Sequence, residues 1–438
     1  MDTEKLYELF LKTGKVATDS RRIEGGELFF ALKGENFNGN KFALAALERG
    51  AAYAVVDEMP DVPQERIILV PDVLSSLQKL ARFHREHLLS GGRRIPVVGL
   101  TGTNGKTTTK NLLKAVLSKK YRVCATEGNL NNDIGVPLSL LKMDSDTEIA
   151  VIEMGASHPD DIAVLVELAR PDFGIITNVG KAHLQGFGSF EGVKRAKGKL
   201  YDFLCAHGGT AFVNADDPVL MRMASERTGM KTVPYGRDAD EASVLPSTAD
   251  NPFLRLRLSD GVPVDTRLVG AYNCPNVLAA LSAGRYFGVS ESLAVEAVES
   301  FVPDNIRSQM IKTGRNTLIV DAYNANPSSM AAALDNFRSV EGNRKIVMLG
   351  DMRELGPDSV SEHAAVIRLL QSMSLDGIFL VGEEFRKASD VERLPSCARL
   401  FESSEELAEA LSREAPSGAV ILIKGSRGVQ MEKVVPFL

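Results

Sequence analysis

The segment from Leu100 to Thr109, Leu-Thr-Gly-Thr-Asn-Gly-Lys-Thr-Thr-Thr, has residue types and a spacing that suit the binding of a nucleoside triphosphate. Gly102 and Gly105 allow the backbone to curl so that several N–H groups point at a phosphate, and the following helix N-terminus adds a partial positive charge. Lys106 can reach the β- and γ-phosphates, and the Thr107 hydroxyl can bind Mg²⁺. The strict pattern has glycine at position 100, where this chain has leucine, so a glycine-rich turn without a ligand is the alternative. We interpret the segment as a nucleotide-binding phosphate loop.

Two further polar side chains follow predicted buried strands. The apolar run Ile149–Glu153 ends in a carboxylate, and an acid at such a strand end, beside a phosphate loop, can hold Mg²⁺ directly or through water. The alternative is an acid at the solvent edge of a sheet. His183 lies shortly after the strand predicted at residues 173–178, where it is either a site residue or an ordinary structural or surface histidine.

Lys197 stands out in the helix predicted from residue 190 to residue 204, because it falls on the apolar side of that helix. The stripe that contains it is formed by Phe190, Val193, Leu200 and Leu204. A lysine in such a stripe must extend its amine to solvent, find an anion or lose its charge. The sharper hypothesis is a lysine that faces a phosphate or metal site and is carboxylated by CO₂, since a carbamate offers oxygen ligands to Mg²⁺.

Asparagine and aspartate residues open two more predicted helices. Asn273 and Asn276 could read an adenine edge, but such residues also cap helices, and we favour capping from the residues alone. Asp321, Asn324 and Asn326 follow a predicted strand, at the end where open α/β sheets bind ligands. The competing interpretation is an asparagine-rich turn before a helix.

Alternating strand and helix patterns indicate α/β domains with mostly parallel sheets. A Gly-Gly-Arg-Arg break at residues 91–94 marks a first boundary, and the strand–helix rhythm restarts after residue 312. Short alternating runs at 236–270 predict a small antiparallel insertion. The predicted strands span 27–32, 52–56, 66–70, 95–100, 148–153, 173–178, 210–214, 317–321, 345–350, 377–382 and 419–424. Helices are predicted at 41–48 and 73–89, and two further helices are predicted to begin near residue 107 and at residue 190.

Length and composition agree with this organisation. At about 150 residues per domain, 438 residues suggest roughly three domains, which we place at 1–91, 92–312 and 313–438. The net charge of −6 argues against a nucleic-acid binder held by a basic field. The start of the chain lacks a signal-peptide pattern, and no apolar run reaches the roughly 18 residues of a membrane span. The four cysteines lie far apart in the sequence and are predicted to be reduced thiols. We also expect the protein to be cytoplasmic and monomeric.

Taken together, several segments resemble the Mur ligases, the ATP-dependent amino-acid and peptide ligases of peptidoglycan synthesis. The resemblance covers nearly the whole chain, from Thr18-Asp-Ser-Arg-Arg near the N-terminus to the C-terminal domain. It implies a small α/β N-terminal domain for a UDP-sugar peptide, a central phosphate-loop ATPase domain with a mostly parallel sheet, and a Rossmann-like C-terminal domain for the incoming amine. The other matching segments are Thr101-Gly-Thr-Asn-Gly-Lys-Thr-Thr, Glu153-Met-Gly-Ala-Ser, Asn178-Val-Gly-Lys-Ala-His, Arg195-Ala-Lys-Gly-Lys, Asn214-Ala-Asp-Asp and Lys424-Gly-Ser-Arg.

The resemblance also implies roles for individual residues. Thr107, Glu153, His183 and a carbamylated Lys197 would bind Mg²⁺, and Lys106, Lys197, Glu153 and His183 would serve catalysis. ATP would be bound by Gly102, Thr103, Asn104, Gly105, Lys106, Thr107, Thr108, Asn273, Asn276, Arg307, Asp321 and Asn324. The peptide substrates would contact Ser20, Arg21, Asn129, Asn131 and Asn326.

Within the family, three segments point to members that add D-alanyl-D-alanine to a UDP-N-acetylmuramoyl-tripeptide. These segments begin at Asn129, Asp321 and Leu349. Two positions depart from the common pattern, because Tyr272 stands where a histidine is usual and Asn38-Gly-Asn40 replaces Asp-Gly-His. The alternatives are another ligase of the superfamily, folylpolyglutamate synthetases included, and, more remotely, a phosphate-loop switch that ligates nothing.

Overall fold

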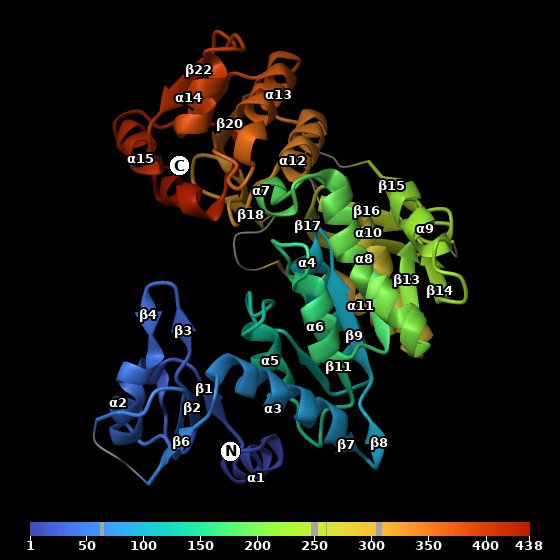
Figure 1. Cartoon of the computed structure of the whole chain (residues 1–438). Coiled ribbons are helices and arrows are strands. Elements are labelled where there is room, and N and C mark those ends of the chain that lie inside the picture. Colours follow the sequence, from blue (N-terminus) through green and yellow to red (C-terminus); the bar gives the residue numbers. More distant parts are fainter. Residues whose placement is uncertain (62–64, 247–252, 260, 304–308) are drawn as a thin grey trace.

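The structure, a computed structural model, describes residues 1–61, 65–246, 253–259, 261–303 and 309–438. Three α/β units follow one another along the chain, with the N-terminal unit at the bottom of Figure 1 and the C-terminal unit at the top. The expected fold class is therefore confirmed. No helix in the described part of the chain combines the length and the apolar character needed to cross a bilayer.

The N-terminal unit contains a four-stranded parallel sheet in the order β1-β2-β5-β6. Its strands are β1 (Val16–Ala17), β2 (Leu28–Phe30), β5 (Tyr53–Val56) and β6 (Ile67–Leu69), and its helices are α1 (Thr3–Thr13), α2 (Ala43–Glu48) and α3 (Val73–His87). Asp72 caps α3 by accepting a hydrogen bond from the backbone N–H of Ser75. Two short hairpins complete this part, β3 (Lys33–Gly34) with β4 (Phe37–Asn38), and β7 (Leu89–Ser90) with β8 (Arg93–Arg94).

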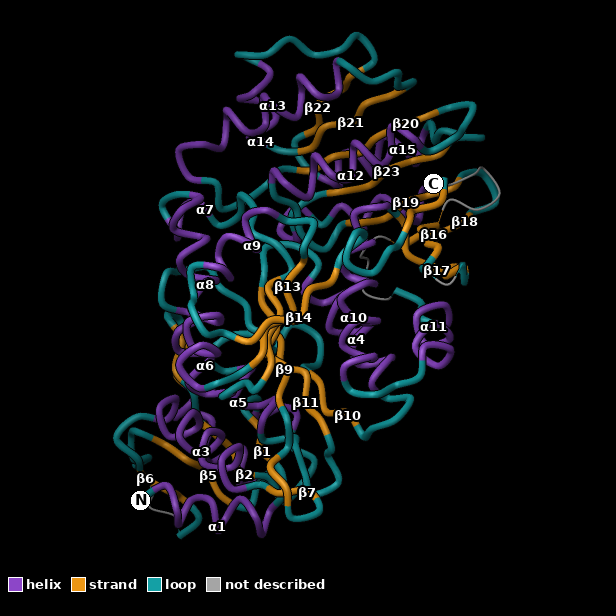
Figure 2. The backbone as a smooth tube through the Cα atoms, turned by 90° about the vertical axis from the view of Figure 1, so that its right-hand side faces the viewer, coloured by secondary structure: helices purple, strands orange, loops and turns teal. Residues whose placement is uncertain are grey.

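The central unit is built on a six-stranded parallel sheet in the order β10-β11-β9-β12-β13-β14. These strands are β9 (Val97–Thr101), β10 (Val123–Ala125), β11 (Ile149–Glu153), β12 (Phe173–Ile176), β13 (Thr210–Asn214) and β14 (Lys231–Tyr235). The sheet is sandwiched between helices, as the turned view shows (Figure 2). The helices are α4 (Lys106–Leu117), α5 (Gly135–Leu140), α6 (Asp161–Ala169), α7 (Leu184–Phe187), α8 (Phe190–His207), α9 (Pro218–Ser225), α10 (Cys274–Tyr286) and α11 (Glu291–Ser300).

The expected antiparallel insertion is present as a three-stranded sheet of β15 (Ser243–Leu245), β16 (Phe253–Arg257) and β17 (Pro263–Val269). Alternation along β16 and β17 places Leu254, Leu256, Val264 and Leu268 in the core that also holds α4 and α10. The insertion is thus packed on the central sheet's helices.

The C-terminal unit has a six-stranded sheet in the order β18-β19-β23-β20-β21-β22, in which only the edge strand β18 pairs antiparallel to its neighbour. The strands are β18 (Gln309–Lys312), β19 (Thr317–Asp321), β20 (Lys345–Gly350), β21 (Gly377–Val381), β22 (Ala398–Phe401) and β23 (Val420–Lys424). The helices α12 (Pro327–Ser339), α13 (Ser359–Gln371), α14 (Glu383–Ser389) and α15 (Ser404–Arg413) cover its two faces.

One apolar core joins the N-terminal and central units. Leu77 and Leu80 of α3 belong to the same buried cluster as Leu140 of α5 and Leu165 of α6. Arg85 of α3, which is fully buried, adds a 2.9 Å ion pair to Asp172 at the start of β12. The C-terminal unit packs around two other apolar clusters, whose buried members apart from Val269 all belong to that unit.

Candidate active site

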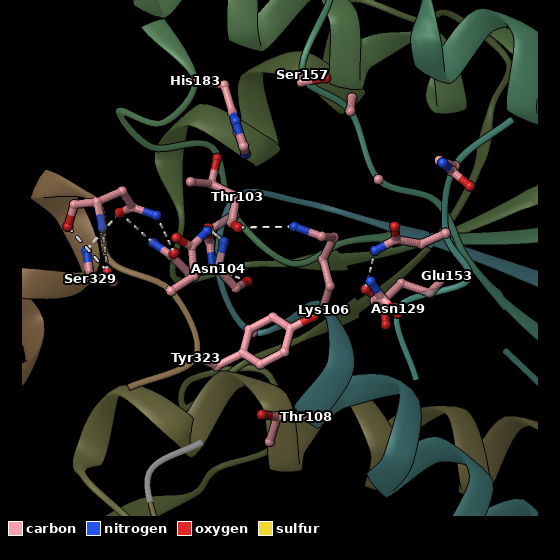
Figure 3. A pocket seen from close by; sticks show the side chains of 18 of the residues that line it. Thr103, Asn104, Lys106, Thr108, Asn129, Glu153, Ser157, His183, Tyr323 and Ser329 are labelled. Carbon is pink, nitrogen blue, oxygen red and sulfur yellow. Dashed lines mark hydrogen bonds between the residues drawn. The ribbon is translucent and has the colours of Figure 1, made fainter. Parts of the chain in front are cut away.

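A cavity of about 1090 Å³ lies at the carboxyl end of the central sheet and extends to the C-terminal unit. It is the natural place for a ligand, since open α/β sheets bind ligands beyond the carboxyl ends of their strands. Figure 3 shows Thr103, Lys106, Glu153 and His183 from the central unit around the same space as Tyr323 and Ser329 from the C-terminal unit. Of the residues expected from sequence, those that line it are Thr103, Asn104, Gly105, Lys106, Thr108, Asn129, Asn131, Glu153, His183, Asn273, Asn276, Asp321, Asn324 and Asn326.

The remaining expected residues lie elsewhere. Ser20 and Arg21 form a short 3₁₀ helix in the N-terminal unit, where Arg21 pairs with Asp19 at 2.8 Å, and they do not line the cavity. Gly102, Thr107 and Lys197 do not line it: Gly102 and Thr107 contact the lining residues Lys106 and Glu153, and Lys197 contacts Gly102. Arg307 lies outside the described residues.

The loop from Gly102 to Gly105 has the curled backbone that a phosphate site needs. Gly102 (φ +146°) and Gly105 (φ +79°) both lie in the left-handed region, and a Cβ at Gly102 would come within 1.9 Å of the Thr177 hydroxyl. The loop after β12 holds it in place, because the backbone N–H of Thr103 donates to the Asn178 carbonyl (3.0 Å) and that of Asn104 to Asn178 Oδ1 (2.9 Å). The N-terminus of α4 then points at the cavity.

Lys106 lies at the first position of α4, with its amine bent back over the loop. The amine donates to the carbonyl oxygens of Gly102 (2.8 Å) and Thr103 (3.1 Å), the second of which is drawn in Figure 3. A cation is therefore held at the place where the loop would receive phosphates.

Glu153 ends β11 as a buried carboxylate that contacts several polar side chains. The Thr107 hydroxyl lies 3.2 and 3.0 Å from its two oxygens, and Asn131 Nδ2 donates to Oε1 at 2.9 Å. Lys110, one turn further along α4, places its amine 3.9 Å from Oε2, and both charged groups are almost fully buried. A buried charge is stable only when it is paired and hydrogen-bonded, and this carboxylate meets that condition.

His183 faces the cavity from a strained position between the central and C-terminal units. Its backbone is left-handed (φ +50°), an uncommon conformation for a residue other than glycine. Nδ1 pairs with the carboxylate of Glu354, which belongs to the C-terminal unit. Burial lowers the pKa of His183, although the Glu354 carboxylate acts in the opposite direction.

Lys197 is buried on the inner face of α8, where the helical pattern places it. Only 3% of the residue is exposed, and the amine donates to the Gly102 carbonyl at 3.0 Å. The interpretation that the amine extends to solvent is therefore wrong. Burial, with a smaller contribution from Lys106, holds the pKa of Lys197 well below its usual value.

The capping interpretation of Asn273 and Asn276 is also wrong. Asn273 precedes α10, but its side chain donates to the Val269 carbonyl (2.9 Å) and accepts from Asn276 (2.9 Å) instead of capping the helix. Asn276 also accepts from the Thr109 hydroxyl at 3.0 Å, so the two asparagines tie α10 to α4 beside the phosphate loop. Spacing could not have distinguished these contacts from a cap.

Asn326, by contrast, does begin a helix, as the asparagine-rich turn predicts. It caps α12 by accepting from the Ser329 N–H at 2.9 Å, and its Nδ2 donates to Asn104 Oδ1 at 2.8 Å. Asp321 pairs with the buried amine of Lys424 at 2.6 Å, and Lys424 also donates to the Asn324 carbonyl. The turn therefore both caps a helix and lines the cavity.

Sequence reasoning missed Lys110 and Glu354 as residues of this site. Lys110 could have been predicted from the sequence, because it lies three positions after Thr107 in a predicted helix and therefore on the same helix face. Glu354 carried none, since only the packing of the C-terminal unit brings its loop to His183.

The fold and the site define a phosphate-loop enzyme of three α/β domains, and comparison with known proteins gives its family. Three family models match successive stretches: the Mur ligase family catalytic domain at residues 14–91, the Mur ligase middle domain at 100–284, and the Mur ligase glutamate ligase domain at 306–427. The UDP-N-acetylmuramoyl-tripeptide–D-alanyl-D-alanine ligase of Bacillus subtilis is 36% identical over 431 residues, covering 96% of this chain and 92% of the relative. The chain belongs to the Mur ligase family.

Solved structures agree with this assignment. The MurF structure from Acinetobacter baumannii has a TM-score of 0.84 and 31% identity, and the match covers 96% of this chain and 92% of that one. The MurF ligase of Thermotoga maritima in complex with ADP also has a TM-score of 0.84, at 28% identity, with 98% and 97% of the two chains covered. The chain therefore shares its full three-domain architecture with MurF ligases.

Proposed function

We propose that this enzyme joins D-alanyl-D-alanine to UDP-N-acetylmuramoyl-tripeptide with ATP, a step of peptidoglycan precursor synthesis. The observation that carries the proposal is the shared cavity, in which a phosphate loop and a buried carboxylate of one domain face polar residues of another. The full-length likeness to D-alanyl-D-alanine ligases gives the substrates.

Amide formation from a carboxylate requires activation. The tripeptide carboxylate attacks the γ-phosphorus of ATP, which gives an acyl phosphate and ADP. The dipeptide amine then attacks the acyl carbon, phosphate leaves, and the amine gives up its proton. Neither step needs a nucleophile from the protein, so the protein's task is to position reactants and to stabilise charge.

Several residues would bind ATP in this scheme. The backbone N–H groups at the start of α4 and the Lys106 amine would hold the phosphates, with Gly102, Thr103, Asn104, Gly105, Thr107 and Thr108 forming the cradle. Asn273 and Asn276 would lie near the adenine, with Asp321 and Asn324 approaching from the C-terminal domain. Ser20 and Arg21 would hold the uridine diphosphate end, away from the cavity.

The donor set around Glu153 fits a magnesium ion. Glu153 is a buried carboxylate whose oxygens touch the Thr107 hydroxyl and the Asn131 amide, and oxygen donors of this kind are what Mg²⁺ prefers. Thr107, Glu153 and His183 would hold the metal, which when bound neutralises charge on the transferring phosphoryl group.

Carbamylation of Lys197 fits the same corner of the cavity. The amine is buried beside the phosphate loop with a lowered pKa, so it is available in the neutral form that reacts with CO₂. A carbamate there would add oxygen donors and a negative charge and so favour the metal.

Two rival functions are less well supported. A different ligase of the superfamily would share the cavity but not the full-length likeness to D-alanyl-D-alanine ligases. A switch that ligates nothing would not need a C-terminal domain whose residues line the nucleotide cavity.

The test is to incubate the protein with ATP, Mg²⁺, UDP-N-acetylmuramoyl-tripeptide and D-alanyl-D-alanine, and to measure phosphate and the mass of the product. We expect phosphate release to depend on the dipeptide and to match the pentapeptide formed. Phosphate release that is indifferent to the dipeptide, or equal rates with single amino acids and with glutamate, would contradict the proposal.

A further inference from the structure

A second, smaller cavity of about 100 Å³ opens beside the main one. The two cavities share His183, Asn324, Asn326 and Glu354 as a common wall. The smaller cavity is otherwise lined by Ala182, Ala325, Arg353 and the segment from Ser426 to Gly428. A ligand bound in the smaller cavity would therefore lie next to the main cavity.

The smaller cavity, here called the side pocket, is lined by charged side chains of both signs. Glu354 lies at the shared wall with 59% of its side chain exposed, and its contact with His183 uses Oε2. The backbone of Glu354 is left-handed (φ +63°), which turns this loop toward the central domain. An anionic group therefore stands at the end of the pocket nearest the phosphate loop's cavity.

Two of the residues that line only the smaller cavity, Arg353 and Arg427, are cationic. The Arg353 guanidinium donates to the Gly428 carbonyl at 3.3 Å, and the Arg427 guanidinium lies 5.1 Å from the centre of the Tyr323 ring. Both residues are exposed, and among the described residues neither guanidinium has a carboxylate within 4.0 Å. Arginines that line a small cavity without an acidic partner are suited to bind a carboxylate.

We propose that this side pocket binds the incoming dipeptide by its two charged ends, with the ammonium group on Glu354 and the terminal carboxylate on Arg427 and Arg353. The inference rests on the proposed function and deepens it, by assigning residues that determine which acceptor is used. Its volume of about 100 Å³ is small beside the 1090 Å³ of the main cavity, which favours a small acceptor such as a dipeptide with methyl side chains.

The positions of the charged lining residues determine the orientation of the bound dipeptide. With its carboxylate at the arginines, the dipeptide extends its amine to the wall shared with the main cavity, where the acyl phosphate forms. Two extended residues span at most about 7 Å, so a longer peptide would carry its two charged ends further apart than a dipeptide does. Glu354 and the two arginines are thus specificity-determining and positioning residues, and none needs to take part in bond making.

The first test measures KM for each substrate separately. We expect Glu354→Gln, and the double variant Arg353→Gln/Arg427→Gln, to raise the KM for the dipeptide about tenfold or more, since a hydrogen bond to a charged group is lost. The KM values for ATP and for the UDP-linked tripeptide should stay within about twofold of wild type. Glu402→Gln and Arg413→Gln are matched exposed controls in the same domain and should leave all three KM values unchanged.

The second test removes one charge from the dipeptide. Wild-type enzyme should use D-alanyl-D-alaninamide, which lacks the carboxylate, about tenfold or more less efficiently than D-alanyl-D-alanine, and the double arginine variant should use both about equally. D-Lactoyl-D-alanine, with a hydroxyl in place of the ammonium, should compete with the dipeptide better in Glu354→Gln than in wild type.

The outcomes separate this inference from the proposed function. If wild type forms pentapeptide but the arginine variant keeps full discrimination against the amide, or if the variants change the KM of ATP as much as that of the dipeptide, the side pocket is not the dipeptide site. If wild type forms no pentapeptide at all, the proposed function itself fails.

Discussion

The side-chain amide of Asn326 donates a 2.8 Å hydrogen bond to Oδ1 of Asn104, a residue 222 positions earlier in the chain. Asn104 belongs to the phosphate loop, and Asn326 begins α12 of the C-terminal domain. The phosphate loop and the C-terminal domain are therefore joined by a pair of side-chain amides.

Replacement of Asn326 separates its two roles. Asn326→Ser keeps a helix-capping hydroxyl but is too short to reach Asn104, so we expect kcat/KM for ATP to fall about three- to tenfold while the melting temperature is unchanged. Asn326→Ala loses the cap as well, at a cost of about 1 kcal/mol in unfolding free energy. Urea unfolding and steady-state kinetics of the two variants check this, and equal kinetics for Asn326→Ser and wild type would contradict the link.

Glu153→Gln tests the metal site with almost no change of shape. The glutamine side chain would keep one oxygen near Thr107 but lose the charge, so we expect activity to fall at least about tenfold and the Mg²⁺ concentration for half-maximal rate to rise. The measurement is a Mg²⁺ titration of phosphate release at saturating ATP. The same Mg²⁺ dependence in variant and wild type would exclude Glu153 as a ligand.

Lys197→Ala tests the carbamate. We expect activity to fall by at least about a hundredfold, because the metal loses a ligand and the loop loses the amine bonded to Gly102. Acetate or another short-chain acid should restore part of it, since a free carboxylate can occupy the space of the carbamate. Full activity of the variant in plain buffer would refute the role.

The lowered pKa of Lys197 also predicts a dependence of stability on pH. The unfolded chain binds a proton on this amine up to about pH 10.4, whereas the folded protein loses it well below that value. Between these two pKa values, unfolding therefore takes up a proton. The loss of folding stability caused by burying Lys197 is greatest at low pH and becomes smaller as the pH rises.

Lys197→Met has no such titration, so its advantage in melting temperature over wild type should narrow between about pH 6 and about pH 9. CO₂-depleted buffers keep the carbamate from contributing. Lys199→Met, at an exposed position on the same helix, is the control and should show a constant difference. A constant difference for Lys197→Met too would mean that its amine stays charged in the folded protein.

The parallel sheets of the central and C-terminal domains were largely predictable, because their buried strands are continuous apolar runs. The short strands β10, β14, β18 and β22 were not predicted, since they lie near sheet edges and are only partly buried. Their sequences therefore lack the apolar signal.

The candidate site divides in the same way. Gly102, Lys106 and Lys197 could be found because a local pattern, a loop motif or a helical stripe, places each of them. The partner of His183 could not, because Glu354 reaches it only through the packing of a domain that begins far along the chain. When the role of a side chain depends on a contact between domains, the sequence around it contains no local pattern that predicts this role.

The core that α3 shares with α5 and α6 has a consequence for how the molecule melts. Since the N-terminal and central domains bury one apolar cluster between them, they should unfold as a single cooperative unit. The C-terminal clusters, whose buried members apart from Val269 all lie beyond residue 317, form a second unit. A ligand that spans the cavity would bind only when both units are folded, so calorimetry should show two transitions in the free enzyme merging toward one as that ligand saturates.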